Sequence, residues 1–184
     1  CKRILPKDKN LMVAYSPVRI AEGCAIEEFL SIPIVVGGID ERSKKEAINF
    51  WQSTLGVDVI PVSSITAAEM VKLADNLWID LNIALAVEVA SLCDYLPQKM
   101  NALEVIRAAN TLPKGQHLVN ILEPSIGVGG SCLTKDSWFV HNIGKNLGLK
   151  LQTPVTARTV NENIPYYSFS RIIDYFQKKG VGLQ

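Results

Sequence analysis

The sequence lacks an excess of charge of either sign, because 19 lysines and arginines face 18 aspartates and glutamates among its 184 residues. Proteins that bind nucleic acids or anionic membranes usually carry a basic excess. Long apolar runs are also missing: stretches such as Ile83–Val87 are far shorter than the roughly 20 residues that cross a bilayer, and no signal peptide opens the chain. We therefore expect a cytoplasmic protein with neither nucleic acid nor a membrane as partner.

Cysteine is scarce and dispersed. Cys1, Cys24, Cys93 and Cys132 form no C-x-x-C pair of the kind that zinc and redox sites use, so we expect reduced thiols. No close group of histidine, cysteine and acidic residues suggests a metal site. The sequence therefore predicts no bound metal.

A dinucleotide-binding fingerprint is missing as well. That fingerprint is a G-x-G-x-x-G turn directly after a strand, followed by an acidic residue for the ribose. The turn Gly127–Cys132 is superficially similar, but Cys132 stands in place of the third glycine. Nothing elsewhere in the sequence supplies the fingerprint.

The first sixty residues have the pattern of mixed α/β structure. Short apolar runs typical of buried strands alternate there with a helical pattern. We expect strands at 11–15, 33–36 and 57–62 and a helix at 40–55. The chain begins with Cys1 instead of Met, and we expect it to be a fragment of a longer protein.

From Ser64 onward the pattern is helical. Thr66–Glu69 has capping-box spacing and no proline or glycine follows until Pro97, which predicts one helix of about thirty residues. Such a length suits an element that bridges domains or forms part of a dimer core. Further helices are expected at 101–110, 131–147 and 153–179, the last one interrupted near Pro165.

The sharpest chemical feature is the turn Gly127-Val-Gly-Gly-Ser-Cys132, whose glycines allow positive φ angles and a close approach to a ligand. Cys132 would lie at a helix start, where free N–H groups and the helix dipole favour a thiolate. A buried, unreactive cysteine is the alternative, because free cysteine is among the most buried residue types. If His117 or His141 served as its base, the chain would instead be a thiol hydrolase.

Three polar residues could assist such a cysteine. Lys72 and Asn76 are four residues apart on the long predicted helix, so they share a face. A desolvated lysine can act as a general base and a carboxamide can donate to an oxyanion, although solvent-exposed polar residues are the alternative. Asp136 follows Cys132 by one helical turn, where it could face the nucleophile or simply complement the helix dipole.

Five segments occur in order along the chain: Ser16–Gly23, Val35–Asp40, Thr66–Lys72, Asn82–Ala84 and Val119–Cys132. In this order they resemble the UDP-glucose/GDP-mannose dehydrogenase family of nucleotide-sugar 6-dehydrogenases. They extend over nearly the whole chain and are specific together, although each alone is weak. The resemblance favours the catalytic interpretation of the cysteine and the lysine, and the last segment is more similar to the branch that acts on UDP-N-acetylhexosamines such as UDP-N-acetylmannosamine or UDP-N-acetylgalactosamine.

The resemblance implies a mainly α-helical chain with two parts. Residues 1–62 would be the C-terminal part of a Rossmann-like, NAD-binding α/β domain. Residues 63–184 would be an all-helical central domain that mediates homodimerisation and resembles the C-terminal domain of 6-phosphogluconate dehydrogenase. A nucleotide-sugar domain would follow.

The implied activity is an NAD-dependent four-electron oxidation of a nucleotide sugar at C6 to the uronic acid, in polysaccharide precursor synthesis. Cys132 would hold the intermediate as a thiohemiacetal and then a thioester. Lys72 and Asn76 would act on the C6 oxygen, and Asp136 would orient the lysine or the hydrolytic water. The competing hypothesis is a non-catalytic module for dimerisation or nucleotide-sugar binding, which the missing fingerprint favours for the chain in isolation.

Motif positions imply the remaining contacts. Glu22, Cys132 and Lys135 would lie beside NAD. The chain departs from many relatives at Val18, where they carry a glutamate, and at Leu118, where several carry an arginine that contacts substrate across the dimer. The residues expected at the substrate are Arg19, Ile20, Ala21, Glu22, Lys72, Asn76, Asn120, Glu123, Ser125, Gly127 and Gly129.

Overall fold

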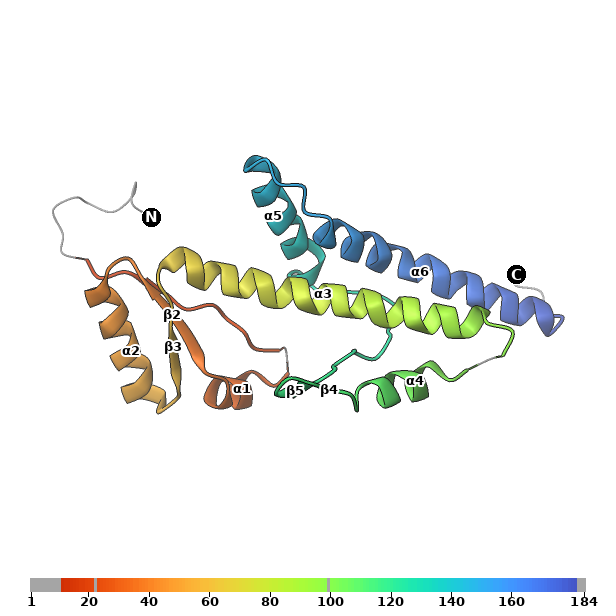
Figure 1. The fold of residues 1–184 in the computed structure, drawn as a ribbon, viewed down its shortest axis with the longest axis horizontal. Helices are drawn as coiled ribbons and strands as arrows, with labels where there is room; N and C mark the ends of the chain where they lie inside the picture. The colour runs from red at the N-terminus through yellow and green to blue at the C-terminus, as the bar shows by residue number, and fades with distance from the viewer. Residues whose placement is uncertain (1–10, 22, 99, 182–184) are drawn as a thin grey trace. The chain divides into compact units, whose positions relative to one another are not determined.

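The computed structural model describes residues 11–21, 23–98 and 100–181 (Figure 1). Contacts divide the chain into two compact units, Cys1–Ala74 and Asp75–Gln184, and each is described by itself. The described residues are mainly helical, which confirms that part of the predicted fold class. The predicted domain boundary after residue 62 stays a prediction.

The first unit is built on a small sheet. Strand β2 is buried along most of its length, runs parallel to β3 and antiparallel to β1, and gives the order β1-β2-β3. Helix α2 packs against these strands (Figure 1). The elements are β1 (Ala14–Tyr15), α1 (Ala25–Ser31), β2 (Ile34–Gly38), α2 (Glu41–Leu55) and β3 (Val59–Pro61).

Most predicted elements of this unit are confirmed. The strand expected at 11–15 is shorter than predicted, with two paired residues, and α1 was not predicted. Asp40 caps α2, because its carboxylate accepts a hydrogen bond from the Ser43 N–H at 2.7 Å. Hydrogen bonds from the Ser43 backbone and hydroxyl lower the pKa of Asp40.

The long helix α3 (Ile65–Tyr95) has 31 residues, as its pattern predicts. Its cap differs from the prediction. The Ser64 hydroxyl accepts a hydrogen bond from the Ala67 N–H at 3.1 Å, so Ser64 caps the helix and Thr66 lies within its first turn.

By length and composition alone, α3 is apolar enough to cross a membrane, which the short apolar runs did not indicate. However, its polar residues Asn76 and Asp80 are buried, and both bond to other helices of the second unit. A helix whose polar groups are satisfied inside the chain is explained as a core helix.

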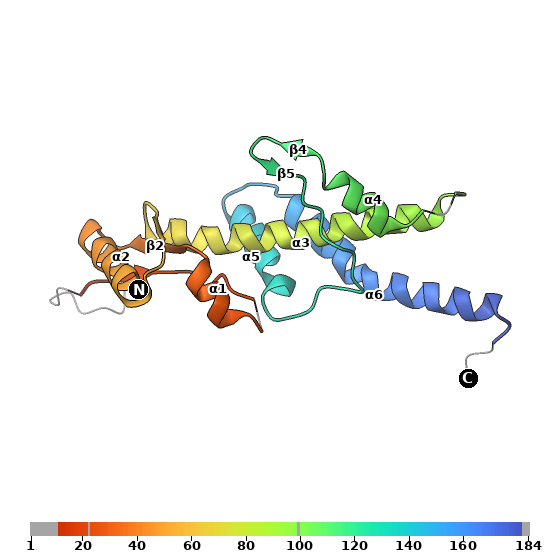
Figure 2. The same cartoon turned by 90° about the horizontal axis from the view of Figure 1, so that it is seen from below.

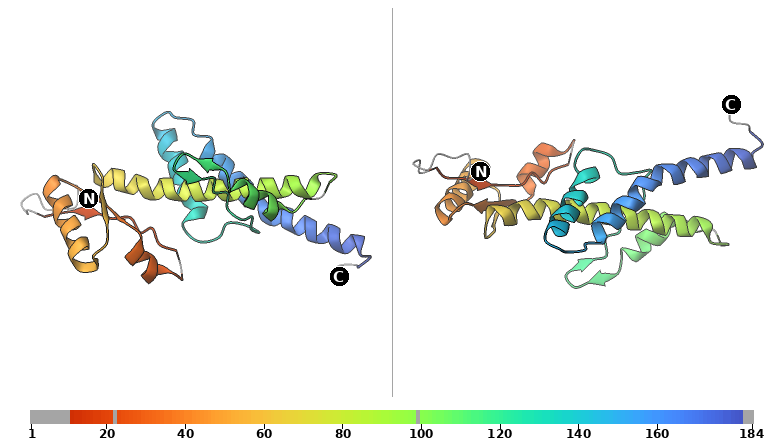
Figure 3. Two further views of the ribbon diagram at one scale, coloured as in Figure 1. Left: turned by 60° about the horizontal axis from the view of Figure 1, so that its bottom comes forward. Right: turned by 90° about the horizontal axis from the view of Figure 1, so that it is seen from above.

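The second unit joins the later part of α3 to three more helices. Figures 2 and 3 show α6 crossing α3, with α5 beside the crossing. A two-stranded ribbon corrects the expectation of an all-helical part, although each of its strands has only two residues. The elements are α4 (Ala102–Ala109), β4 (Pro113–Lys114), β5 (His117–Leu118), α5 (Leu133–Asn146) and α6 (Thr153–Lys178).

Helix α6 is continuous through Pro165, so the predicted interruption there is wrong. Proline removes one backbone hydrogen bond of the helix. Side chains fasten α6 to α3 on both sides of it: Arg158 bonds to Asp80 before the proline, and Tyr167 bonds to Asp94 after it. These contacts hold the helix together across the missing bond.

Candidate functional site

The glycine-rich turn places Cys132 at the start of α5, as predicted. Cys132 is exposed and precedes the first helical residue, Leu133, while its carbonyl accepts the Asp136 N–H at 2.9 Å and closes the first turn. Gly127 and Gly130 have φ angles of 147° and 81°, which only glycine adopts without strain. The turn therefore presents an accessible thiol beside the free N–H groups of a helix N-terminus.

Two of the four predicted catalytic residues are in direct contact. Asn76 on α3 donates a hydrogen bond to Asp136 on α5 at 2.6 Å, and both side chains are buried. The Lys135 ammonium lies 3.2 Å from the other oxygen of Asp136 and is half-exposed. The carboxylate is thus fixed one turn after Cys132, as helical spacing predicts.

Lys72 lies on α3 one turn before Asn76 and is partly buried. It belongs to the first compact unit, whereas Asn76, Cys132 and Asp136 belong to the second. Its predicted role as a base remains a prediction.

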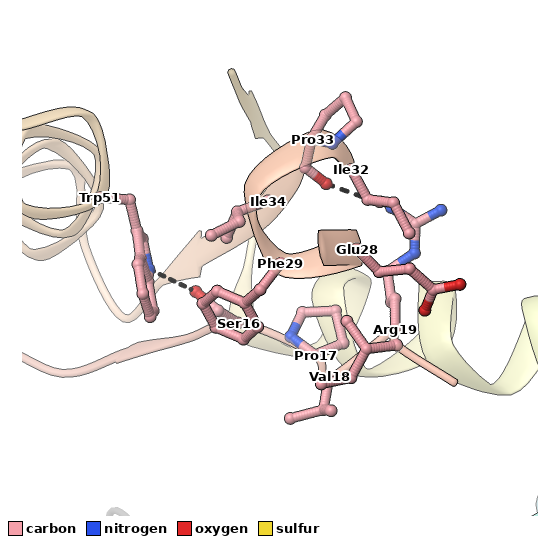
Figure 4. Close-up of a pocket in the computed structure, with 11 residues that line it drawn as sticks. Ser16, Pro17, Val18, Arg19, Glu28, Phe29, Ile32, Pro33, Ile34 and Trp51 are labelled. Carbon is pink, nitrogen blue, oxygen red and sulfur yellow. Dashed lines mark hydrogen bonds between the residues drawn. The ribbon is translucent and has the colours of Figure 1, made fainter. Parts of the chain in front are cut away.

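The expected substrate segment around Arg19 surrounds a small apolar pocket of about 100 Å³ in the first unit (Figure 4). Arg19 donates to the Pro33 carbonyl at 3.4 Å, and Trp51 donates to the Ser16 hydroxyl at 3.1 Å. The Ala21 N–H donates to the Glu28 carboxylate at 2.5 Å. Expected site residue Glu22 lies outside the described residues, and the pocket is lined by Ser16, Pro17, Val18, Arg19, Ile20, Glu28, Phe29, Ile32, Pro33, Ile34 and Trp51.

Two asparagines hold the extended segment that leads to the glycine turn. Asn82 on α3 donates to the Asn120 carbonyl at 2.6 Å and accepts from the Leu122 N–H at 2.8 Å. Asn110, at the end of α4, both donates to and accepts from the backbone of Ile121 at 2.8 Å. Each carboxamide therefore pairs with the backbone as a neighbouring strand would, and the two together fix the register of this segment.

Further along, the segment makes weaker contacts. Glu123 pairs with Arg107 at 3.3 Å, where both side chains are largely exposed, and the Ser125 hydroxyl donates to the Gly127 carbonyl at 3.1 Å. Asn120, Glu123, Ser125, Gly127 and Gly129 thus lie on one continuous segment, as the sequence dictates. Substrate binding by these five residues stays a prediction.

No sequence motif pointed to the buried polar group around Asp80. This aspartate is fully buried and accepts hydrogen bonds from Arg158 at 2.8 Å, Ser137 at 2.7 Å and Asn161 at 2.6 Å. The only signal in the sequence is an acidic residue inside an apolar helix. Asn82 and Asn110 were also missed as side-chain clamps, although Asn82 belongs to one of the recognised segments.

The alternative base for Cys132 finds no support in the described residues. His117 lies on β5 and His141 lies nine positions into α5, and no hydrogen bond joins either of them to Cys132 there. The buried Nδ1 atom of His141 has no hydrogen-bond partner. Among the described residues, no three histidine, cysteine or acidic side chains form a group that could hold a metal.

Residues 66–163 match the profile of the UDP-glucose/GDP-mannose dehydrogenase family, central domain. The UDP-N-acetyl-D-mannosamine dehydrogenase of Methanocaldococcus jannaschii is 36% identical over 178 residues, which are 97% of this chain and 39% of that protein. A UDP-D-ManNAc dehydrogenase structure from Pyrococcus horikoshii superposes with a TM-score of 0.83 at 31% identity, over 96% of this chain and 40% of that one.

A UDP-glucose dehydrogenase from Pyrobaculum islandicum is similar with a TM-score of 0.80 at 27% identity, over 90% of this chain and 37% of that one. The chain therefore spans about two fifths of the length of these relatives.

Proposed function

Because this chain belongs to the UDP-glucose/GDP-mannose dehydrogenase family, we propose that it is the central part of an NAD-dependent nucleotide-sugar 6-dehydrogenase that oxidises C6 to the carboxylate. The observation that carries the proposal is Cys132, exposed at the start of α5, with the buried Asn76–Asp136 pair one turn behind it. Several similar proteins are named UDP-N-acetyl-D-mannosamine dehydrogenase, so a UDP-N-acetylhexosamine is the proposed substrate class.

The cysteine explains how two oxidations proceed without release of an aldehyde. The Cys132 sulfur adds to the C6 aldehyde, which forms a C–S bond and a thiohemiacetal. The oxygen of this adduct, left as an oxyanion by thiolate addition, re-forms the C=O bond as a second hydride leaves C6, which gives a thioester. Water then displaces the thiolate, and the carboxylate and two protons are released. A thiol at a helix N-terminus suits these steps, because it must add as a thiolate and leave as one.

The polar residues act on oxygen atoms and protons. Asn76 donates to the C6 oxygen as negative charge develops there, while Asp136 holds the Asn76 carboxamide in place through their 2.6 Å hydrogen bond. Lys72, one turn before Asn76 on α3, is the proposed base for the C6 hydroxyl proton. Positioned donors at a developing charge are commonly worth several kcal/mol, about 3 for one donor.

NAD accepts the two hydrides when it is bound. The residues present fit only its reacting end: Cys132 is exposed, the Lys135 ammonium is half-exposed, and Glu22 is the third expected neighbour. The sequence holds no G-x-G-x-x-G turn for the pyrophosphate. Residues 1–62 are proposed as part of the NAD-binding domain and residues 63–184 as the helical domain, of the 6-phosphogluconate dehydrogenase type, through which a cytoplasmic homodimer forms.

A second candidate is a non-catalytic module that dimerises or binds a nucleotide sugar. The exposed cysteine and its ordered polar neighbours favour the enzyme, because binding alone requires no nucleophile.

The test is NADH formation by the full-length protein that contains this chain, with UDP-hexoses and UDP-N-acetylhexosamines as substrates, counted per sugar consumed. We expect two NADH per sugar with one substrate class, and expect Cys132→Ser to abolish uronate formation. Cys24→Ser is the matched control, because Cys24 is also exposed and has no proposed role. No NADH with any sugar would favour the binding module, and unchanged turnover by Cys132→Ser would contradict the cysteine mechanism.

A further inference from the structure

A buried ion pair lies next to the proposed active site without belonging to it. Asp80 and Arg158 are 0% and 2% exposed, and their side chains are 2.8 Å apart. The carboxylate also accepts from the Ser137 hydroxyl and the Asn161 carboxamide. Three helices, α3, α5 and α6, therefore meet at one carboxylate.

This group fastens the first turns of α5. Ser137 on α5 donates to Asp80 at 2.7 Å, and Arg158 donates at 3.4 Å to the carbonyl of Leu133, the residue that follows Cys132. Both bonds are therefore made by the stretch of α5 that begins at the proposed nucleophile.

The bonds form a ladder between α3 and α5. The neighbouring residues Asp136 and Ser137 bond to Asn76 and Asp80, which are one turn apart on α3. The first rung contains residues with proposed chemical roles. The second rung is completely buried, so it cannot touch a substrate.

We propose that Asp80, with Arg158 as its counter-ion, is a positioning residue that sets Cys132 and Asp136 relative to Asn76. A carboxylate that accepts three hydrogen bonds from two helices fixes both their distance and their rotation, which an apolar contact of the same size would not. Such precise positioning matters at a reactive centre, because a displacement of a reacting group by about 1 Å can lower the rate on the order of 100-fold. The inference rests on the proposed function.

The test compares Asp80→Asn with Asp94→Asn in the protein. Both variants remove an acidic residue of α3 that pairs with an arginine of α6, but Asp94 pairs with Arg171 at 3.4 Å, is partly exposed and has no bond to α5. We expect Asp80→Asn to lower kcat 10- to 100-fold with KM changed less than threefold. We expect Asp94→Asn to leave both constants within twofold.

Each variant is assayed at the same interval below its own Tm, so that a general loss of stability cannot mimic the effect. Ser137→Ala is the milder variant in case Asp80→Asn does not fold, because it removes one bond to α5 and keeps the ion pair. We expect a three- to tenfold loss of kcat from Ser137→Ala. If the folded Asp80 and Ser137 variants keep the parental kcat, the proposal is wrong.

A second measurement needs no sugar. We expect the rate of Cys132 alkylation by iodoacetamide at neutral pH, followed by peptide mass spectrometry, to fall at least threefold in Asp80→Asn, because a loosened first turn no longer keeps the helix N-terminus aligned with the residue that precedes it. Cys132 is already exposed, so loosening gains little in access. If the protein oxidises no sugar but Asp80→Asn slows the alkylation of Cys132, the positioning role is upheld and the proposed function is contradicted. If the protein is active and Asp80→Asn changes neither alkylation nor kcat, the positioning role alone is contradicted.

Discussion

Replacing Asn82 by alanine tests whether the clamp on the segment from Asn120 to Leu122 matters for substrate binding. The substitution removes one hydrogen bond of 2.6 Å and one of 2.8 Å, both to the backbone. A hydrogen bond contributes about 1 kcal/mol net, and this segment is partly exposed, so water satisfies part of what is lost. We expect the free energy of unfolding to fall by about 1–2 kcal/mol.

The substitution should also weaken substrate binding by a similar free energy. If the segment must be ordered to bind a nucleotide sugar, the Asn82→Ala variant must order it during binding, which reduces the binding free energy by the same amount. A loss of about 1–2 kcal/mol corresponds to a KM raised about 5- to 30-fold. The value of kcat should change less, because Asn82 bonds to none of the proposed catalytic side chains. Urea unfolding and steady-state kinetics give the two numbers.

Two controls accompany this variant. Asn110→Ala removes the matching pair of bonds to Ile121 and should raise KM in the same way. Asn163→Ala removes an exposed bond within α6 and should change neither quantity. An unchanged KM in an Asn82 variant that has lost the expected stability would refute the reasoning, since the segment would then be ordered for structure alone.

Two predictions concern the first unit. Because its hydrogen-bond partners lower the pKa of Asp40, this carboxylate contributes stability that is present above its unfolded pKa of about 4 and is lost as the pH falls through the folded pKa. In urea unfolding between pH 2 and 7, the free energy of unfolding of Asp40→Asn should therefore fall less steeply at acid pH than that of the parent. An unchanged acid dependence would contradict this cause. A Cβ at Gly37 would collide with the Ser64 carbonyl, so Gly37→Ala should lower the free energy of unfolding by about 2 kcal/mol or more. Gly129→Ala is the control: nothing lies within 4 Å of the added atom, and the free energy of unfolding should change by about 0.5 kcal/mol or less.

Local patterns predicted the regular elements well. The apolar periodicity and the absence of proline and glycine located α3, and the glycine turn located Cys132 at the start of α5. The errors occur where a neighbouring side chain decides. Ser64 caps α3 although Thr66 has the better motif, and α6 continues through Pro165 because α3 holds it on both sides.

The Asp80 group was unpredictable for a different reason. Its partners Ser137 and Arg158 are 57 and 78 positions away in the sequence, and no spacing rule connects residues at that distance. The same holds for Asn82, whose bonds reach 38 and 40 positions along the chain. Short-range motifs pointed to Cys132, the proposed nucleophile, whereas Asp80 and Asn82 became visible as side-chain contacts only once the helices were packed.

Helix α3 carries several of the polar residues that are discussed above. Lys72, Asn76 and Asp80 follow one another at intervals of four, which places a polar stripe along one side of a helix that is otherwise apolar enough for a bilayer. Buried polar groups cost stability unless each is satisfied, so an apolar stripe would hold these helices together at less risk. Burial of Asn76 and Asp80 on α3 is therefore what we expect if the two residues serve the proposed chemistry at Cys132 and not packing alone.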